Sequence, residues 1–191
     1  MFVDYLTLVM ITLIAGFVLL AYYLYAGLDA SDQRPFAAAF GTVGVLEIIL
    51  GLSLSFTWPL PGSFNIAYGE TTTLFGAVFL GAAVALSQGW DLMPVALFGF
   101  FAGLDAFIMG ARIISLKMGQ QPLLAGISFF LAGLAGVLAA PTLGILKKNK
   151  ALRMVAIIIL LITALAWCVT YVPSVWAHLA DFAKYVPASM K

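Results

Sequence analysis

The stretch Asp91–Leu116 reads DLMPVALFGFFAGLDAFIMGARIISL, and it sets the problem that the rest of the fold must solve. It is longer than the roughly 20 apolar residues that a helix needs to cross the hydrocarbon core of a bilayer. Yet it carries Asp105 near its middle and Arg112 two turns later. A charged side chain at that depth costs at least ~2.5–3.5 kcal/mol, so it needs a partner, a water-filled cavity or a function.

The composition of the whole chain agrees with a membrane location. Hydrophobic residue types make up 64% of the 191 residues, and charged types only 9%. A soluble domain carries roughly 25% charged residues, so this chain has too few to cover a surface that faces water. We therefore expect an all-α protein of the cell membrane, with the lipid bilayer as its main partner. The net charge is +1 and there is no basic tract, so nucleic acid is not expected as a partner.

Six apolar segments have about the length of a membrane span. They lie at about 4–26, 36–58, 71–88, 91–116, 122–146 and 152–172. The longest connection is the polar and aromatic loop 59–70. Pro173 is expected to end the sixth span, because proline lacks the backbone N–H that a continuing helix would use. The sequence thus predicts a six-helix transmembrane domain over residues 1–173.

The remaining residues, 174–191, are predicted to form a C-terminal amphipathic helix at the membrane interface. Val175, Leu179, Phe182 and Val186 recur at helical spacing, and polar residues lie between them. Ser174 is a suitable residue to cap the start of this helix.

The placement of lysine and arginine predicts the orientation of the spans. With six spans, the links 26–35 and 147–153 lie on one side of the membrane. They contain five cations, Arg34, Lys147, Lys148, Lys150 and Arg153, whereas the other side has Lys117, Lys184 and Lys191. We therefore expect the N- and C-termini outside the cell and the Lys147–Lys150 loop in the cytoplasm.

Glu47 lies near the centre of the second span. Gly44, Glu47 and Gly51 are spaced at i, i+3 and i+7, so they share one face of a helix. Small residues on such a face let a neighbouring helix approach closely, which predicts that Glu47 points into protein and away from lipid. Two interpretations stay open: a functional intramembrane acid, or a protonated glutamate that is hydrogen-bonded in the core.

Asp105 and Arg112 are seven residues apart, so they project from one face, separated by about 10 Å along the helix axis. That separation is too long for a direct ion pair. Gly99, Gly103 and Gly110 lie roughly opposite Asp105, so the helix is predicted to have a packing side and a polar side. The polar side either lines a permeation path, or Asp105 bonds a neighbouring helix while Arg112 extends toward the membrane surface.

Several kinds of chemistry are not expected. Cys168 is the one cysteine and His178 the one histidine, which excludes an internal disulfide, a Cys-x-x-Cys site and a haem held by two histidines of this chain. The sequence shows no His/Glu metal cluster, no phosphate-binding loop and no nucleophile–base pair. We therefore expect no bound cofactor, no metal and no enzymatic activity.

Two resemblances bear on the function. Residues 74–83 (LFGAVFLGAA) and 89–94 (GWDLMP) resemble the hairpin between the third and fourth helices of the urea channel and amide transporter family. Residues 62–69 (GSFNIAYG), 89–91 (GWD) and 122–126 (PLLAG) resemble an uncharacterised archaeal and bacterial six-helix membrane family, a domain of unknown function. The second resemblance covers nearly the whole chain but implies no activity.

The channel resemblance implies a pore through each six-helix protomer and is compatible with a homo-oligomer, a ring of six. In that family aromatic residues on the third and fifth helices narrow the pore. The corresponding positions here are all small: Ala77, Gly81, Ala135 and Ala139. The pore is therefore wider than in that family, or other side chains fill it, or there is no pore.

Three functions remain open at this point. The first is a channel or facilitator for a small, mostly uncharged solute, with Glu47, Asp105 and Arg112 as polar lining. The alternative is a non-catalytic integral subunit of a larger membrane complex, for instance a respiratory one. A third is a membrane enzyme or a lipid- or quinone-binding protein that uses Glu47 and Asp105.

Overall fold

The computed structural model describes residues 5–181 and 183, and all of its regular structure in these residues is helical. The elements are α1 (Tyr5–Tyr22), its π-helical continuation η1 (Tyr23–Gly27), α2 (Pro35–Thr57), α3 (Phe64–Gln88), α4 (Met93–Ser115), α5 (Pro122–Lys148) and α6 (Lys150–Asp181). The prediction of an all-α fold with six long helices is therefore confirmed.

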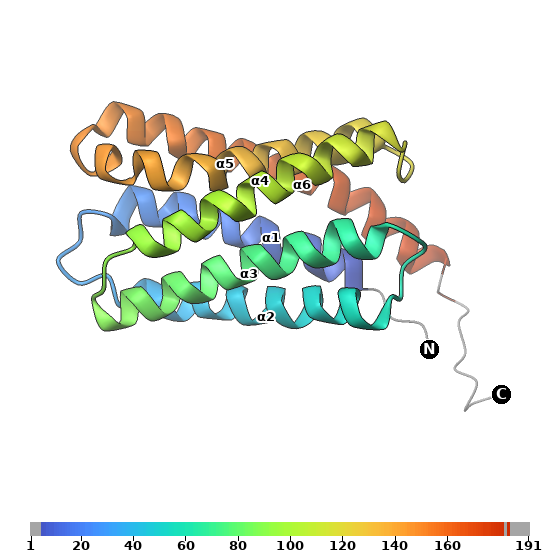
Figure 1. Cartoon of the computed structure of the whole chain (residues 1–191), viewed down its shortest axis with the longest axis horizontal. Helices are drawn as coiled ribbons and strands as arrows, with labels where there is room; N and C mark the ends of the chain where they lie inside the picture. Colours follow the sequence, from blue (N-terminus) through green and yellow to red (C-terminus); the bar gives the residue numbers. More distant parts are fainter. Residues whose placement is uncertain (1–4, 182, 184–191) are drawn as a thin grey trace.

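The helices lie along one bundle axis, and successive helices run in opposite directions (Figure 1). Helix α2 packs mainly on α3, α4 on α5, and α1 on α6. Helix α1 begins and α6 ends at the same end of the bundle, together with the links 58–63 and 116–121; we call this the terminal end. The links 28–34 and 89–92, and Asn149, lie at the opposite end.

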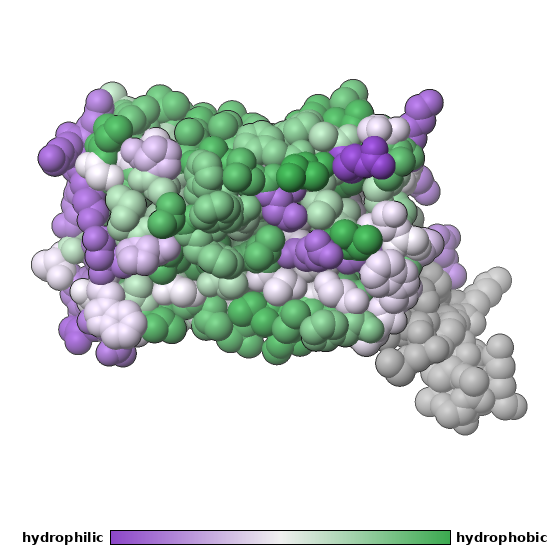
Figure 2. Space-filling model, in the orientation of Figure 1, coloured by the Kyte–Doolittle hydropathy of each residue, from purple (hydrophilic) through white to green (hydrophobic). Residues whose placement is uncertain are grey.

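The exterior of the bundle suits a bilayer. Each of the six helices is long and apolar enough to cross a membrane. Figure 2 shows a broad hydrophobic band between two hydrophilic ends. Large apolar side chains such as Phe101, Ile108 and Leu165 are more than half exposed, which water would not favour. The chain is thus a multi-pass membrane protein.

Glycines bring the paired helices into backbone contact. A methyl group placed on Gly44 of α2 would lie 2.9 Å from the carbonyl oxygen of Gly76 on α3. In the same way, a methyl group on Gly136 of α5 would lie 2.7 Å from the carbonyl oxygen of Gly99 on α4. Close approach of this kind drives helix association in membranes, where burial of apolar surface supplies little. The predicted packing faces of the second and fourth spans are confirmed.

Helix α3 begins at Phe64, so the expectation of a loop over 59–70 and a short third span over 71–88 is wrong. The reason lies in Asn65, whose side chain is fully buried. Its amide oxygen accepts from the N–H of Leu60 at 2.9 Å, and its amide nitrogen donates to the carbonyl of Gly62 at 3.0 Å. These hydrogen bonds of Asn65 hold the α2–α3 link in a turn, and α3 begins directly after it.

Helix α6 continues through Pro173, so the separate interfacial helix predicted from residue 174 is not present: residues 174–181 extend α6. Proline removes one hydrogen bond from a helix, but membrane helices tolerate proline because neighbouring helices, hydroxyl side chains and local adjustments of the backbone compensate. Ser174 donates to the carbonyl of Thr170 at 2.8 Å, and Thr170 to that of Trp167 at 2.8 Å. Phe182 and residues 184–191, including Val186, lie outside the described residues.

An ion pair joins three helix ends at the opposite end of the bundle. Arg153 of α6 donates to Asp29 of the α1–α2 link at 2.6 and 2.9 Å, and to the carbonyls of Leu146 and Lys147 in the last turn of α5. The hydrogen bonds from Arg153 hold the pKa of the Asp29 carboxyl below its ordinary value. Arg153 is thus hydrogen-bonded and ion-paired within the protein, whereas the orientation prediction from sequence treats it only as one of the loop cations.

Candidate functional site

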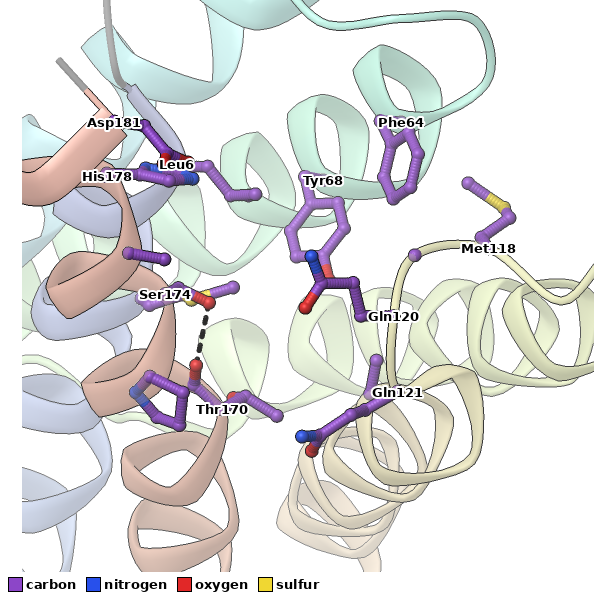
Figure 3. Close-up of a pocket in the computed structure, with 15 residues that line it drawn as sticks. Leu6, Phe64, Tyr68, Met118, Gln120, Gln121, Thr170, Ser174, His178 and Asp181 are labelled. Atoms are coloured by element: carbon purple, nitrogen blue, oxygen red, sulfur yellow. Dashed lines mark hydrogen bonds between the residues drawn. The ribbon is translucent and has the colours of Figure 1, made fainter.

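A cavity of about 300 Å³ opens at the terminal end of the bundle. Its walls come from α1, α3, α5, α6 and the α4–α5 link (Figure 3). The polar side chains in its lining are Tyr68, Gln120, Gln121, Thr170, Ser174, His178 and Asp181. Leu6, Met10, Phe64, Met118 and Ala125 supply most of the apolar lining. A concave, partly apolar site with a few convergent polar groups is typical of small-molecule binding.

One wall of the cavity is built by α6. Thr170, Ser174 and His178 recur every four residues, so they lie on one face of the continuous helix. The hydroxyl groups of Thr170 and Ser174 donate to backbone carbonyls, which leaves their oxygen lone pairs available as acceptors.

The facing wall carries amide groups. Figure 3 shows Gln120 and Gln121 across the space from Thr170 and Ser174. Each glutamine amide offers both donors and an acceptor. The cavity therefore presents uncharged hydrogen-bonding groups from two sides, while His178 and Asp181 of the last α6 turns add an imidazole and a carboxyl group.

An aromatic cluster lies deeper, where α3, α5 and α6 meet. The ring centroid of Phe129 is 5.2 Å from that of Tyr68 and 5.2 Å from that of Trp167. Tyr68 also lines the cavity, and Trp167 lies three residues before Thr170 on the same helix. All three rings are almost wholly buried. Tyr68 thus joins this cluster to the lining of the cavity.

Trp167 has an indole N–H that is buried without a hydrogen-bond partner among the described residues. An unpaired buried donor costs about 1–3 kcal/mol, and such groups are rare in native structures. The sequence by itself offers no reason for a tryptophan at this depth. Trp167 is in contact with Tyr68, which does line the cavity.

Glu47 is fully buried, as the sequence predicts. Its Oε1 is hydrogen-bonded to the hydroxyl of Thr12 on α1, and its backbone packs against Gly76 of α3. The other carboxyl oxygen, Oε2, is buried without a partner among the described residues.

The Thr12 hydroxyl has more than one possible acceptor, so two arrangements of its hydrogen bond with Glu47 exist, one of which needs a protonated Glu47. The Thr12 hydroxyl is also 2.9 Å from the carbonyl of Leu8 and 3.0 Å from that of Val9, and carbonyls only accept. Thr12 has one proton to donate. If that proton goes to a carbonyl, the Glu47 carboxyl must supply the proton for the second bond.

Asp105 and Arg112 are in different surroundings from Glu47. The Asp105 carboxylate accepts from the hydroxyl of Thr71 on α3 at 2.7 Å, so it bonds a neighbouring helix. Arg112 is exposed, in the last turn of α4. Thr71 and Gly76 are five residues apart, about 140° around α3. Glu47 and Asp105 therefore contact different sides of α3, and the three charged residues do not form one hydrogen-bonded group.

The four small residues that match the narrow part of the urea channel family are half-buried. They are Ala77, Gly81, Ala135 and Ala139. A methyl group on Gly81 would lie 3.5 Å from Val95, and one on Gly99 would lie 4.0 Å from Ala139. Both Val95 and Gly99 belong to α4, so Gly81 and Ala139 pack against that helix. None of the four is in the lining of the terminal cavity.

The residues of the cavity are those that sequence reasoning missed. Thr170, Ser174 and His178 have a common spacing of four, but the signal is lost when Pro173 is taken as a helix end. Gln120 and Gln121 resemble ordinary link residues, and only the fold brings their link over α6.

Comparisons with known proteins give a family and no activity. No curated protein and no solved structure matches the chain. A family model described as a protein of unknown function (DUF981) matches residues 1–181. The six-helix membrane chain described above therefore belongs to this DUF981 family.

Proposed function

We propose that the protein is a facilitator for a small, mostly uncharged solute, which enters from water through the cavity at the terminal end. The observation that carries this proposal is the cavity lining, with uncharged donors and acceptors on two facing walls. A role in catalysis is not part of the proposal.

The size and chemistry of the cavity set the solute class. Since a water molecule takes about 30 Å³ of liquid volume, a cavity of about 300 Å³ corresponds to about ten water molecules and admits a small solute. Amide and hydroxyl groups can bond an uncharged polar molecule from both sides. A charged solute would find no charged side chain in the aromatic cluster, where Tyr68, Phe129 and Trp167 are buried.

The aromatic cluster supports a likeness in mechanism to the urea channel and amide transporter family. In that family aromatic residues of the third and fifth helices form the narrow part of the pore. Tyr68 of α3 and Phe129 of α5 are in edge-to-face contact, with Trp167 of α6 beside them. We propose that this cluster is the constriction, in place of Ala77, Gly81, Ala135 and Ala139, and that solute passes when the rings move.

Filling the cavity is expected to stop solute flux. In Ser174→Phe a large ring replaces a hydroxyl of the lining, so uptake into proteoliposomes should fall to the level of empty vesicles. Leu179→Phe is the matched control, because Leu179 lies on the same helix but is 70% exposed, and it should keep the native rate. Urea, short amides, ammonia, acetate and water are the solutes to measure.

The proposal fails if the native protein gives no uptake of any of these solutes above empty vesicles. It also fails if Ser174→Phe and Leu179→Phe have the same rate while both are folded, as judged by thermal unfolding.

A second candidate function is a non-catalytic subunit of a larger membrane complex. The observation in its favour is that Glu70 and Arg112 are exposed on helices that could span the membrane. Purification in a mild detergent separates the two candidates, because a different protein that co-purifies in fixed ratio supports the subunit. We favour association with further copies of the same chain.

We propose that the terminal end faces the outside of the cell membrane. Two of the five cations at the opposite end are paired, Arg34 with Asp32 and Arg153 with Asp29. Lys147, Lys148 and Lys150 remain exposed there, and they give that end the positive character typical of the cytoplasmic side.

Labelling from outside the cell is expected to reach the terminal end only. In a Cys168→Ala background, Lys117→Cys should react with an impermeant maleimide in intact cells, whereas Lys148→Cys should react only after lysis. The reverse pattern would invert the proposed orientation.

A further inference from the structure

Two exposed side chains of opposite charge lie on the outer side of α3 and α4. Glu70 is on α3 and Arg112 on α4, and both are exposed. Figure 2 shows hydrophilic groups within the hydrophobic surface over these two helices. An exposed charge on a membrane-spanning helix is better placed against a polar or oppositely charged group than against lipid, so it marks a surface that something covers or uses.

The two residues lie at similar depth from the terminal end. Glu70 is six residues after the start of α3, about 9 Å along the axis, and Arg112 is three residues before the end of α4, about 4.5 Å. The difference is less than one helical turn of 5.4 Å. An arginine side chain can cover that difference.

Neither residue has an ion-pair partner within the described part of its own protomer. The ion pairs there join Arg34 to Asp32 and Arg153 to Asp29, at the opposite end. The nearby acid Asp105 is half-buried and bonded to Thr71 within the protomer. Glu70 is thus the exposed acidic residue on the α3–α4 face, and Arg112 is the exposed basic residue on it.

We propose that two copies of this chain associate through this α3–α4 face, with Glu70 of each protomer paired to Arg112 of the other. A two-fold dimer of this kind leaves no free copy of the interface for a third protomer. It therefore differs from the ring of six with which the channel resemblance is compatible. This inference rests on the self-association put forward under the proposed function.

Symmetry is the reason that a second copy fits this face. A two-fold axis along the membrane normal keeps every residue at the same depth in both protomers, and such interfaces are self-complementary. A face that carries one acid and one base at nearly one depth forms two identical ion pairs under that operation. The pairing also sets the register of the two copies.

Apolar residues on α4 supply the rest of the contact. Phe101 is 61% exposed, Leu104 40% and Ile108 62%. Phe101, Ile108 and Arg112 recur at seven and four residues, so they share the side of α4 that carries the charge.

Charge reversal tests the pairing. Glu70→Arg and Arg112→Glu are each expected to weaken association at least about tenfold, because each sets two like-charged pairs against one another. Both positions are basic in Glu70→Arg, and both are acidic in Arg112→Glu. Mixing the two variants is therefore expected to restore association, because every base of one variant then faces an acid of the other. Association is measured by energy transfer between differently labelled protomers in lipid vesicles, and by mass in a mild detergent.

The mixed sample distinguishes pairing between protomers from pairing within one protomer. If Glu70 and Arg112 paired within one protomer, mixing would restore nothing. Lys148→Glu, at the opposite end, is the control reversal and should associate as the native chain does. Native protein that is monomeric in vesicles, single reversals that associate normally, or another protein in place of the second copy would each overturn the inference.

The association experiment is independent of the solute proposal. Association is measured without solute, so a failure of pairing leaves the expected flux through the cavity unchanged. Absence of flux in an intact dimer would count against the facilitator and leave the pairing in place.

Discussion

Gly103→Ala is expected to destabilise the protein by about 3 kcal/mol or more. A methyl group at Gly103 would lie 2.5 Å from the backbone nitrogen of Val137 and 2.6 Å from the carbonyl oxygen of Gly133, both on α5. These are backbone atoms of a helix, so they cannot turn aside as a side chain can. Helices α4 and α5 would have to separate, and the close contact that replaces hydrophobic driving force in a membrane would be lost.

Gly144→Ala is the matched control for this change. Gly144 is also within α5, but nothing lies within 4 Å of a methyl group added there. Alanine is better than glycine inside a helix by roughly 0.5–1 kcal/mol, so this variant should be as stable as the native chain or slightly more so. The measurement is thermal unfolding of both variants in one detergent, followed by circular dichroism. Equal stability of the two variants would contradict the packing described for α4 and α5.

Glu47→Ala is expected to cost about 2–4 kcal/mol, the second largest effect. The substitution leaves a void in a core position and removes the hydrogen bond to Thr12. Glu47→Gln, in contrast, should unfold within about 1 kcal/mol of the native protein. The glutamine amide has the shape of a neutral carboxyl group and can accept a hydrogen bond from the Thr12 hydroxyl as Glu47 does, or donate one to it.

The comparison of the two variants decides the role of Glu47. A structural, protonated glutamate predicts a stable Glu47→Gln variant whose flux in proteoliposomes is unchanged. A glutamine variant that is as unstable as the alanine variant would show that Glu47 is needed as a carboxylate. Normal stability with lost flux would instead assign Glu47 to the permeation path.

The helices could be located from sequence because each span is a long apolar run, and a bilayer requires such a run whatever its neighbours are. The packing faces could be found too, since Gly44 and Gly51 flank Glu47 at helical spacing and the face points toward α3. Asn65 has no signal of this kind. Its effect on the start of α3 depends on hydrogen bonds to the carbonyl of Gly62 and the N–H of Leu60. These backbone groups come within reach of Asn65 only when the α2–α3 link has folded into a turn.

Pro173 shows where local rules lead to a wrong prediction. Proline inside a helix removes one backbone hydrogen bond, and its ring clashes with the carbonyl four residues earlier, so it commonly kinks or ends the helix. In α6 the helix nevertheless continues through Pro173, and the hydroxyl groups of Thr170 and Ser174 bond the carbonyls of Trp167 and Thr170 within the same turns. That continuation creates the α6 wall of the cavity. A prediction that ends the helix at Pro173 therefore cannot place Thr170, Ser174 and His178 on one helix face.

The amino-acid sequence by itself determined that this chain enters a membrane, how many membrane-spanning helices it has, and which faces of the second and fourth of them pack. Those properties depend on hydropathy and spacing along one segment. Only the tertiary structure decided which polar groups meet: Glu47 with Thr12, Asp105 with Thr71, and Gln120 and Gln121 with the α6 face. Hydrogen bonds and cavities join residues from different helices, and the relative rotation of two helices is set by packing along their whole length.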